Sequence, residues 1–498
     1  MIDLAQEFVR PQVELGGIAP EIALTLTALL VLVVHAFVGD RGGNVYVPLM
    51  TTAGFGVALF FCVAVWGDSD LQLGRMIALD GFSTFIKVVL SVFGVLTVWL
   101  ARDYLTREGI EESEFYALVL FAVAGMMLMA SAADLIVIFL ALETFSLALY
   151  VLVGYRRRSL EGQEASMKYF LLGAFSSAFF LLGIALAYGA TGTTNLYAAP
   201  NDPSSVGIFS FLSSSPTDEV GLMVLAAGFL IVGLGFKVAA VPFHMWTPDA
   251  YQGAPSPVTG FMAAGSKLAG FAAVIRLLES ALIQLRWDWR PLVIGIAVLT
   301  MLIGSIVAVV QEDLKRMLAY SSIAHAGFVF TGIIAANDRG VSGALFYLAT
   351  YGLTVLGAFA IISVISGRGE QRSRLVDHKG LFFENPLLAG ALTLFLLSLA
   401  GVPITSGFVG KLVVFGAAIE AGYEWVVVIG VLASAIAAFF YLRVMVVMYM
   451  QEPDEGREPL RPGPLALGVI GLTAAATLVF GILWAPLIDL AERATFYF

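Results

Sequence analysis

The chain has 498 residues, of which 59% are hydrophobic and 13% are charged, and its mean hydropathy is +0.91. This composition excludes an ordinary soluble globular protein, because soluble domains carry about 25% charged residues. The net charge of −10 is accompanied by no basic stripe, so nucleic acid is not an expected partner.

An apolar run of about 20 residues is long enough to cross the hydrocarbon core of a bilayer. By that length the sequence predicts an all-α polytopic membrane protein with about fourteen transmembrane helices. The predicted spans are 19–38, 45–66, 80–101, 115–131, 133–154, 164–190, 220–241, 256–279, 292–310, 317–336, 340–366, 386–416, 424–450 and 463–488. The seventh and twelfth are interrupted near Pro242 and Pro403, since proline frees backbone groups that hydrocarbon cannot satisfy.

The loops between the predicted helices carry uneven numbers of lysine and arginine residues. Loops after odd-numbered helices hold fourteen, and loops after even-numbered helices hold four. Because cytoplasmic loops are enriched in these residues, the difference predicts both termini on the outer, periplasmic side. It also favours an even number of helices, since one missed helix would scramble the alternation.

Two short echoes suggest internal repetition. The motif at 168–170 resembles that at 346–348, and the motif at 240–242 resembles that at 401–403. Both offsets are five helices, and an odd offset inverts the second unit, so helices 4–8 and 9–13 would be inverted repeats. Short apolar matches also arise by chance, so the echoes alone leave the repeat open. The corresponding divisions of the chain are 1–114, 115–280, 281–450 and 451–498.

Ionisable residues inside the spans are the candidates for chemistry, because a charge at the bilayer centre costs about 2.5–3.5 kcal/mol on insertion scales. The deep candidates are Glu143, Lys237, Lys267, His325 and Lys411. Accessory candidates near a helix end or a break are Glu164, Lys168 and His244. Burial and neighbouring charges poise such groups between holding and releasing a proton, so a row of them predicts a proton relay.

Each candidate also has a purely structural interpretation. Glu164 could be an interfacial anchor, and the deep lysines and Glu143 could form buried ion pairs without a transport role. His244 could satisfy the backbone loosened at Pro242, and His325 could be a hydrogen-bonded core histidine. A structural membrane scaffold with an inactive relay therefore remains an alternative to a transporter.

The sequence contains no recognisable cofactor motif. Its four histidines are scattered, and the single cysteine, Cys62, lies in an apolar run, so no metal-ligand spacing is present. No glycine-rich nucleotide-binding loop is evident either, since the 51 glycines are spread through the spans, where they suit close helix contacts. We therefore expect neither a cofactor nor a metal in this chain.

Several motifs resemble the antiporter-like subunits of respiratory complex I. They are HMWTPDAYQGAPSPVTGFMAAGSKLAGFA at 244–272, QEDLKRMLAYSSIAHAGF at 311–328, ALETFSL around Glu143, MKYFLLGAFSSA from Met167 and the interrupted GVPITSGFVGK ending at Lys411. The YQGAPSPVTGF wording and Lys411 are most similar to the N-type subunits of bacterial NADH-quinone oxidoreductase. The resemblance implies fourteen helices with two inverted five-helix repeats and broken helices 7 and 12.

The resemblance also implies a role for each candidate residue. Glu143 would partner Lys237 on the broken seventh helix, and Lys267 would be the central lysine of the eighth. Lys411 would be the terminal lysine of the broken twelfth helix, and His325 would connect the two halves of the relay. Accessory positions on the input side would be Glu164, Lys168 and His244.

The function implied by the resemblance is proton translocation coupled to quinone reduction, in a bacterial cytoplasmic membrane. This chain would hold no redox centre, while NADH, FMN, iron–sulfur clusters and quinone would be used by other subunits. The expected partners are the lipid bilayer and other membrane-arm subunits, including the M-type antiporter-like subunit and small membrane subunits. A subunit of a multi-subunit cation/proton antiporter would share the fold and the lysines, so it remains an alternative.

Overall fold

The computed structural model describes residues 14–110, 113–199, 205–214, 220–370, 372–453, 460 and 462–496, with the side chains of 40–44 left out. Within these residues, twelve helical stretches are long and apolar enough to cross a membrane. Eleven of them correspond to α1 (Ala19–Val38), α2 (Asp40–Ala64), α3 (Gly81–Glu108), α4 (Ser113–Ser131), α5 (Leu135–Val153), α6 (Leu160–Thr191), α12 (Arg286–Val309), α13 (Leu314–Ala335), α14 (Asp338–Ile365), α18 (Glu424–Met450) and α19 (Pro464–Ile482). The remaining one is continuous through α10 (Ser256–Phe261), η3 (Met262–Ser266), α11 (Lys267–Arg276) and η4 (Leu277–Ala281).

Two further apolar helices are shorter, and they begin the two spans that the sequence predicts to be broken. α8 (Gly221–Lys237) is followed by non-helical turns and then by α9 (Trp246–Gly253). α16 (Pro386–Ala400) is followed by a second interruption and then by α17 (Ser406–Glu420). Both predicted interruptions are therefore confirmed.

Local capping decides where the predicted boundaries differ from the observed ones. The predicted span 164–190 begins too late, because the Ser159 hydroxyl accepts a hydrogen bond from the Gly162 amide at 3.1 Å and starts α6 at Leu160. The helix ends where Gly192 adopts the left-handed conformation that favours glycine. The span 424–450, by contrast, coincides with α18.

The sequence did not predict the short elements between the spans. β1 (Asp70–Gln72) and β2 (Ile77–Leu79) form an antiparallel hairpin in which Asp70 faces Leu79. The other short elements are α7 (Ile208–Ser214), α15 (Leu381–Glu384), α20 (Ala485–Glu492), η1 (Gly16–Ile18), η5 (Ile283–Leu285), η6 (Arg368–Glu370) and η7 (Leu375–His378). These segments are too short for a periodic pattern to be recognised.

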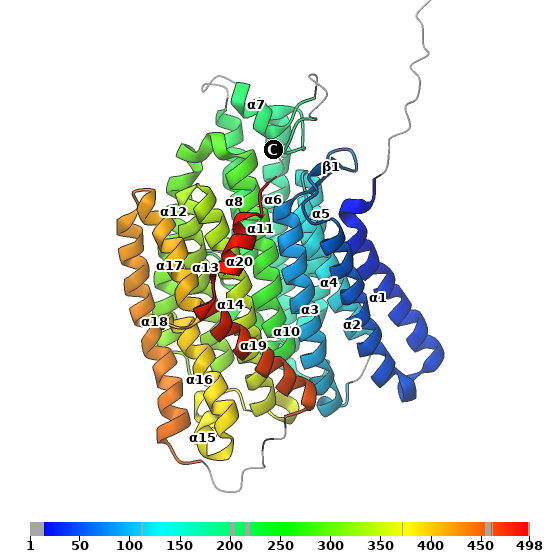
Figure 1. The fold of residues 1–498 in the computed structure, drawn as a ribbon, viewed down its shortest axis with the longest axis vertical. Helices are drawn as coiled ribbons and strands as arrows, with labels where there is room; N and C mark the ends of the chain where they lie inside the picture. Colours follow the sequence, from blue (N-terminus) through cyan, green and yellow to red (C-terminus); the bar gives the residue numbers. More distant parts are fainter. Residues whose placement is uncertain are drawn as a thin grey trace, which may run out of the picture.

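Both described ends of the chain lie at the same end of the helix bundle (Figure 1). The Gly17 amide donates a hydrogen bond to Gln72 Oε1 of β1 at 2.7 Å. The Phe82 amide, directly after β2, donates to the Thr495 carbonyl at 3.1 Å. Ends on one side agree with the even number of crossings that the loop charges favour.

The centre of the bundle is formed by the stretch 256–281 together with α13 and α14. In the most apolar part of each of these spans, between 94% and 100% of the residues are buried, compared with 22% in the first span. α1 and α2 form one flank and α18 the opposite flank (Figure 1). These outer helices expose apolar side chains such as Leu26, Phe60 and Val431, as expected where lipid covers the surface.

Candidate functional site

The break after α8 places Lys237 inside the protein. α8 ends at this residue, and the following turn passes through Ala239, whose φ is 61°. The Lys237 ammonium donates hydrogen bonds to Ser146 Oγ at 2.9 Å and to the Tyr169 hydroxyl at 3.0 Å. It also lies 4.2 Å from the centre of the Phe145 ring, within cation–π range. The residue is only 3% exposed, so neutral hydroxyls and aromatic rings replace water around it.

Glu143 lies half-buried on α5, and its carboxylate accepts a hydrogen bond from the Ser177 hydroxyl of α6. The resemblance implies that Glu143 partners Lys237, but the two side chains form no direct ion pair. The hydroxyl of Ser146, one turn further along α5, accepts the hydrogen bond from the Lys237 ammonium instead. The structure therefore shows Glu143 and Lys237 bound to different serines rather than to each other.

Lys267 occupies the junction between η3, a π-helical turn, and α11. Such turns occur frequently at functional sites. The Lys267 ammonium donates hydrogen bonds to the Ser322 carbonyl and, at 2.7 Å, to the Ser322 hydroxyl. It lies 5.8 Å from the centre of the Tyr351 ring, and the residue is 3% exposed. Lys267 is thus bound to α13 without a carboxylate in contact.

His325 lies on α13 between two tyrosine hydroxyls. Its Nδ1 is 2.7 Å from the Tyr347 hydroxyl of α14, and its Nε2 is 3.3 Å from the Tyr441 hydroxyl of α18. Tyr441 also shares a hydrogen bond with Ser321, the neighbour of Ser322. An imidazole with a hydroxyl at each nitrogen can accept a proton at one nitrogen and donate from the other.

Lys411 occupies the second break. Its ammonium donates hydrogen bonds to the carbonyls of Ala400 at 3.0 Å and Leu399 at 3.2 Å, which end α16. These carbonyls have no partner within the helix and carry the negative end of its dipole, so a cation is favoured there. Gly401, with a φ of 87°, leaves the required space, because a Cβ there would lie 3.0 Å from Lys411 Cδ.

The helices that carry the three lysines and His325 pack against one another in turn: α8 against α11, α11 against α14, α14 against α13, and α13 against α17. At one end, a Cβ added to Gly270, one turn beyond Lys267, would lie 3.6 Å from Lys237 Cγ. At the other end, Tyr347 packs against Gly410, the neighbour of Lys411. The hydrogen bonds of α13 described above lie between these two contacts. The five deep candidates are therefore brought into one region of the fold.

The accessory candidates divide into a pair and a separate histidine. The Lys168 ammonium lies 2.6 Å from Glu164 and 2.9 Å from Asp249, and Asp249 also binds Arg316 at 2.6 Å. Lys168, Glu164 and Asp249 line a polar pocket of about 220 Å³. His244 lies half-buried in the turn after α8, and within the described residues its Nδ1 has no hydrogen-bond partner. It forms no hydrogen bond with the other seven candidates.

Sequence reasoning missed most of the partners that hold these groups. The missed residues are Ser146, Tyr169, Ser177, Asp249, Arg316, Ser321, Ser322, Tyr347 and Tyr441. A signal existed for two of them. Ser146 follows Glu143 by three residues, and Ser322 precedes His325 by three, which places each pair on one helix face. The tyrosines gave no signal, because an aromatic residue in an apolar span suggests packing.

Comparisons with known proteins decide the family. Residues 132–437 match the family described as NADH:quinone oxidoreductase/Mrp antiporter, transmembrane. The chain belongs to this family. NADH-quinone oxidoreductase subunit N of Trichlorobacter lovleyi is 42% identical and aligns over 99% of both chains.

Solved structures agree with this family assignment. A chain of respiratory complex I from Thermus thermophilus with bound aureothin is 35% identical, with a TM-score of 0.79 over 95% of this chain and 99% of that one. A chain of the Mrp complex from Dietzia sp. has a TM-score of 0.81 over 95% of this chain and 96% of that one. At 23% identity, the second likeness shows a shared fold. Within the part of the chain described here, no cluster of three or more His, Cys, Asp or Glu side chains could hold a metal ion.

Proposed function

We propose that this chain is a proton-translocating membrane subunit of NADH-quinone oxidoreductase. The observation that carries the proposal is the row of three buried lysines, each 3–6% exposed and bound by hydroxyls or backbone carbonyls. Buried ammonium groups without a carboxylate in contact are expensive in a bilayer and mark ion pathways. The relatives named NADH-quinone oxidoreductase subunit N, at 41–43% identity over nearly the whole chain, support the same function.

The proposed route begins with Glu143 and Lys237. Closing the Glu143–Lys237 pair would hold the ammonium charge, and opening it would release a proton toward Lys267. His325 and its tyrosine partners would carry the proton on toward Lys411. The accessory residues of the input side would be Glu164, Lys168 and His244. Moving a proton against ~150 mV requires about 3.5 kcal/mol, an amount that the rearrangement of one buried charge pair can supply.

The finer architecture is part of the same proposal. Twelve full-length spans together with the two broken ones, α8–α9 and α16–α17, would make fourteen crossings. Helices 4–8 and 9–13 would be inverted repeats, placing one broken helix and its lysine in each. The termini would lie on the periplasmic side of a bacterial cytoplasmic membrane, as the loop charges favour. The division of the chain into 1–114, 115–280, 281–450 and 451–498 follows from this arrangement.

Partners and cofactors follow from the function. Glu143 is half-buried beside apolar side chains such as Leu140 and Leu147, which are 54% exposed. A carboxylate at this depth is unfavourable against lipid, so a neighbouring membrane-arm subunit would cover the α5 face. The M-type antiporter-like subunit and small membrane subunits are the proposed neighbours. NADH, FMN, iron–sulfur clusters and quinone would be used by other subunits of the complex.

The deciding experiment uses membrane vesicles from cells that carry Lys237→Ala. Proton pumping and quinone reduction are recorded together, with assembly of the complex verified on a native gel. The relay predicts loss of both activities in an assembled complex. A matched control is the double variant Lys87→Gln, Glu21→Gln, which removes a buried lysine and its partner 2.7 Å away, outside the row. Unchanged pumping by Lys237→Ala would favour a structural role for the lysines.

The antiporter alternative is supported by the fold shared with the Mrp complex chain. It predicts sodium-dependent proton exchange in vesicles that lack any quinone reductase. The higher identity to the complex I chain, 35% against 23%, favours the respiratory function. Sodium-dependent exchange without quinone reduction would reverse this preference.

A further inference from the structure

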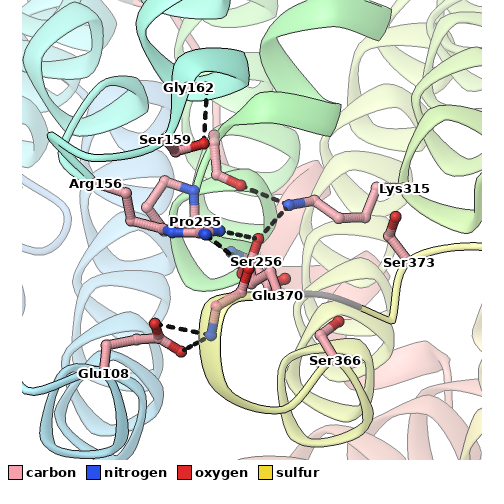
Figure 2. Close-up of polar contacts among 12 residues, drawn as sticks. Glu108, Arg156, Ser159, Gly162, Pro255, Ser256, Lys315, Ser366, Glu370 and Ser373 are labelled. Atoms are coloured by element: carbon pink, nitrogen blue, oxygen red, sulfur yellow. Dashed lines mark hydrogen bonds and ion pairs between the residues drawn. The ribbon is translucent and has the colours of Figure 1, made fainter.

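Glu370 lies in the loop after α14, yet its side chain is only 4% exposed. Figure 2 shows its carboxylate between three donors from different parts of the chain. It accepts hydrogen bonds from the Ser256 amide at 2.6 Å and Lys315 Nζ at 2.8 Å, and the Arg156 guanidinium lies 3.4 Å away. The Lys315 ammonium also donates to the Ala254 carbonyl at 2.5 Å. None of these residues belongs to the proposed relay.

The backbone around Glu370 is held in an unfavourable conformation. Its φ is 52°, in the left-handed region that side chains other than glycine rarely adopt. Such a conformation persists only where the surrounding structure fixes it. The preceding Gly369 amide donates to both Glu108 oxygens at 2.9 and 3.0 Å, and its carbonyl accepts from Arg156 Nη2 at 2.6 Å (Figure 2).

The rest of this loop is fixed to α13. The Leu314 amide donates to the Ser373 carbonyl at 2.8 Å, and the Leu375 amide donates to the Glu312 carbonyl at 2.7 Å. We call residues 366–370 and 372–375 the strap. The strap thus joins the end of α3, the α5–α6 loop, the start of α10 and the start of α13.

Two of the helices joined by the strap carry the centre of the proposed relay. Ser256 begins the continuous helical stretch that contains Lys267, and Lys315 lies in the first turn of α13, which contains Ser322. At 1.5 Å per residue, Lys267 lies about 16 Å along its helix from Ser256, too far for Glu370 to exchange protons with it directly. Glu370 accepts hydrogen bonds within 2.8 Å from the starts of both helices, so its carboxylate links them.

We propose that Glu370 is a positioning residue, which keeps the helix of Lys267 in register with α13 and so maintains the hydrogen bonds between Lys267 and Ser322. This inference rests on the proposed relay function. If the carboxylate is lost, Lys315 keeps its bond to Ala254 but no longer bridges the two helices through an anion. An axial shift between the helices would then separate the Lys267 ammonium from the Ser322 hydroxyl, now 2.7 Å away.

The test compares variants in the complete complex in membrane vesicles. Glu370→Asp keeps the charge but shortens the side chain, so it cannot span both Ser256 and Lys315. Glu370→Gln, combined with Lys315→Gln, removes the anion without leaving Lys315 as an unpaired buried charge, which protects assembly. The control is Glu312→Gln, which removes a strap-side ion pair with Arg374 in which the side chains are 80% and 67% exposed.

Coupled quinone reduction and proton pumping are normalised to the amount of assembled complex. We expect Glu370→Asp to lower turnover per complex about tenfold, the equilibrium factor for one lost charge-assisted hydrogen bond between the helices. The double variant should lower it at least as much, while the control stays unchanged. Hydrogen–deuterium exchange should increase at the starts of α10 and α13 in the same samples. A purely structural role predicts less complex with normal turnover per complex, and that result would overturn the proposal.

Two further outcomes separate this inference from the relay itself. Unchanged hydrogen–deuterium exchange in both helices would refute the positioning role, whatever happens to pumping. Increased exchange with normal turnover would show that pumping does not depend on this register, and it would also refute the inference. The relay is tested independently by Lys237→Ala, a residue that the strap does not contact.

Discussion

Replacing Arg276 tests how much one buried ion pair stabilises this fold. The Arg276 guanidinium is fully buried and binds both Asp80 oxygens, at 2.8 and 3.0 Å. It also donates to the Ala130 carbonyl at 2.9 and 3.1 Å. That carbonyl lies in the last turn of α4, where it has no partner within the helix. Arg276→Met therefore leaves the buried Asp80 carboxylate without its counter-ion and the Ala130 carbonyl without its donor.

The expected loss is about 3–5 kcal/mol for breaking the buried pair, which corresponds to a hundredfold to several-thousandfold lower ratio of folded to unfolded protein. Adding Asp80→Asn removes the lone charge and keeps the oxygen that caps α3. The double variant should therefore lose only about 1–3 kcal/mol, for the Ala130 carbonyl left without a donor.

The assay is the thermal unfolding midpoint in detergent, together with the amount of subunit retained in the membrane. The control Arg339→Met removes an ion pair with Glu420 in which both side chains are about half exposed. Surface pairs contribute at most about 1 kcal/mol, so this variant should resemble the wild type. The reasoning would be refuted if Arg276→Met had the same unfolding midpoint as the control. It would also be refuted if adding Asp80→Asn to Arg276→Met did not raise the unfolding midpoint.

Three further predictions follow from other contacts. Gly270→Ala should lower turnover per assembled complex in vesicles, because its Cβ would lie 2.8 Å from Val238 Cγ1 and displace the end of α8; normal turnover would contradict this packing argument. Lys411→Ala should abolish pumping and lower the unfolding midpoint, since two buried carbonyls of α16 lose their donor, and retained pumping would remove Lys411 from the route. Burial alone raises the pKa of Glu370, but Lys315 and the Ser256 amide hold it below its ordinary value of 4.5. The stability from Glu370 is therefore present above about pH 4.5 and lost as the pH falls further, so Glu370→Gln should reduce the dependence of the unfolding midpoint on pH below that value; an unchanged slope would contradict the prediction.

The sequence predicted the membrane fold well because span length and apolar content are local properties. The segment 424–450 matches α18, and both interruptions occur where Pro242 and Pro403 suggested them. Errors at the boundaries came from caps such as Ser159, whose side-chain hydrogen bond begins α6 earlier than hydropathy indicates. The β1–β2 hairpin was missed because three-residue strands carry no usable period.

The candidate site could be predicted only in part. Depth along a span identified Lys237, Lys267 and Lys411 as buried, but it could not identify their partners. When a helix is apolar on all sides, its sequence does not show which face points toward a neighbouring helix. The sequence therefore could not show that Glu143 would contact Ser177 rather than Lys237. Buried Glu370 was missed because charged residues in a loop are usually solvated.

At the second break, one side chain satisfies the last carbonyls of α16. While Lys411 is an ammonium, it supplies the donors that the Leu399 and Ala400 carbonyls lack. If that group loses its proton, its remaining hydrogens cannot compensate both carbonyls as strongly, and water becomes the best substitute. Departure of a proton would therefore draw water to the break, and its return would expel that water. If the proposed relay operates, these two carbonyls would therefore bind water mainly while Lys411 is deprotonated.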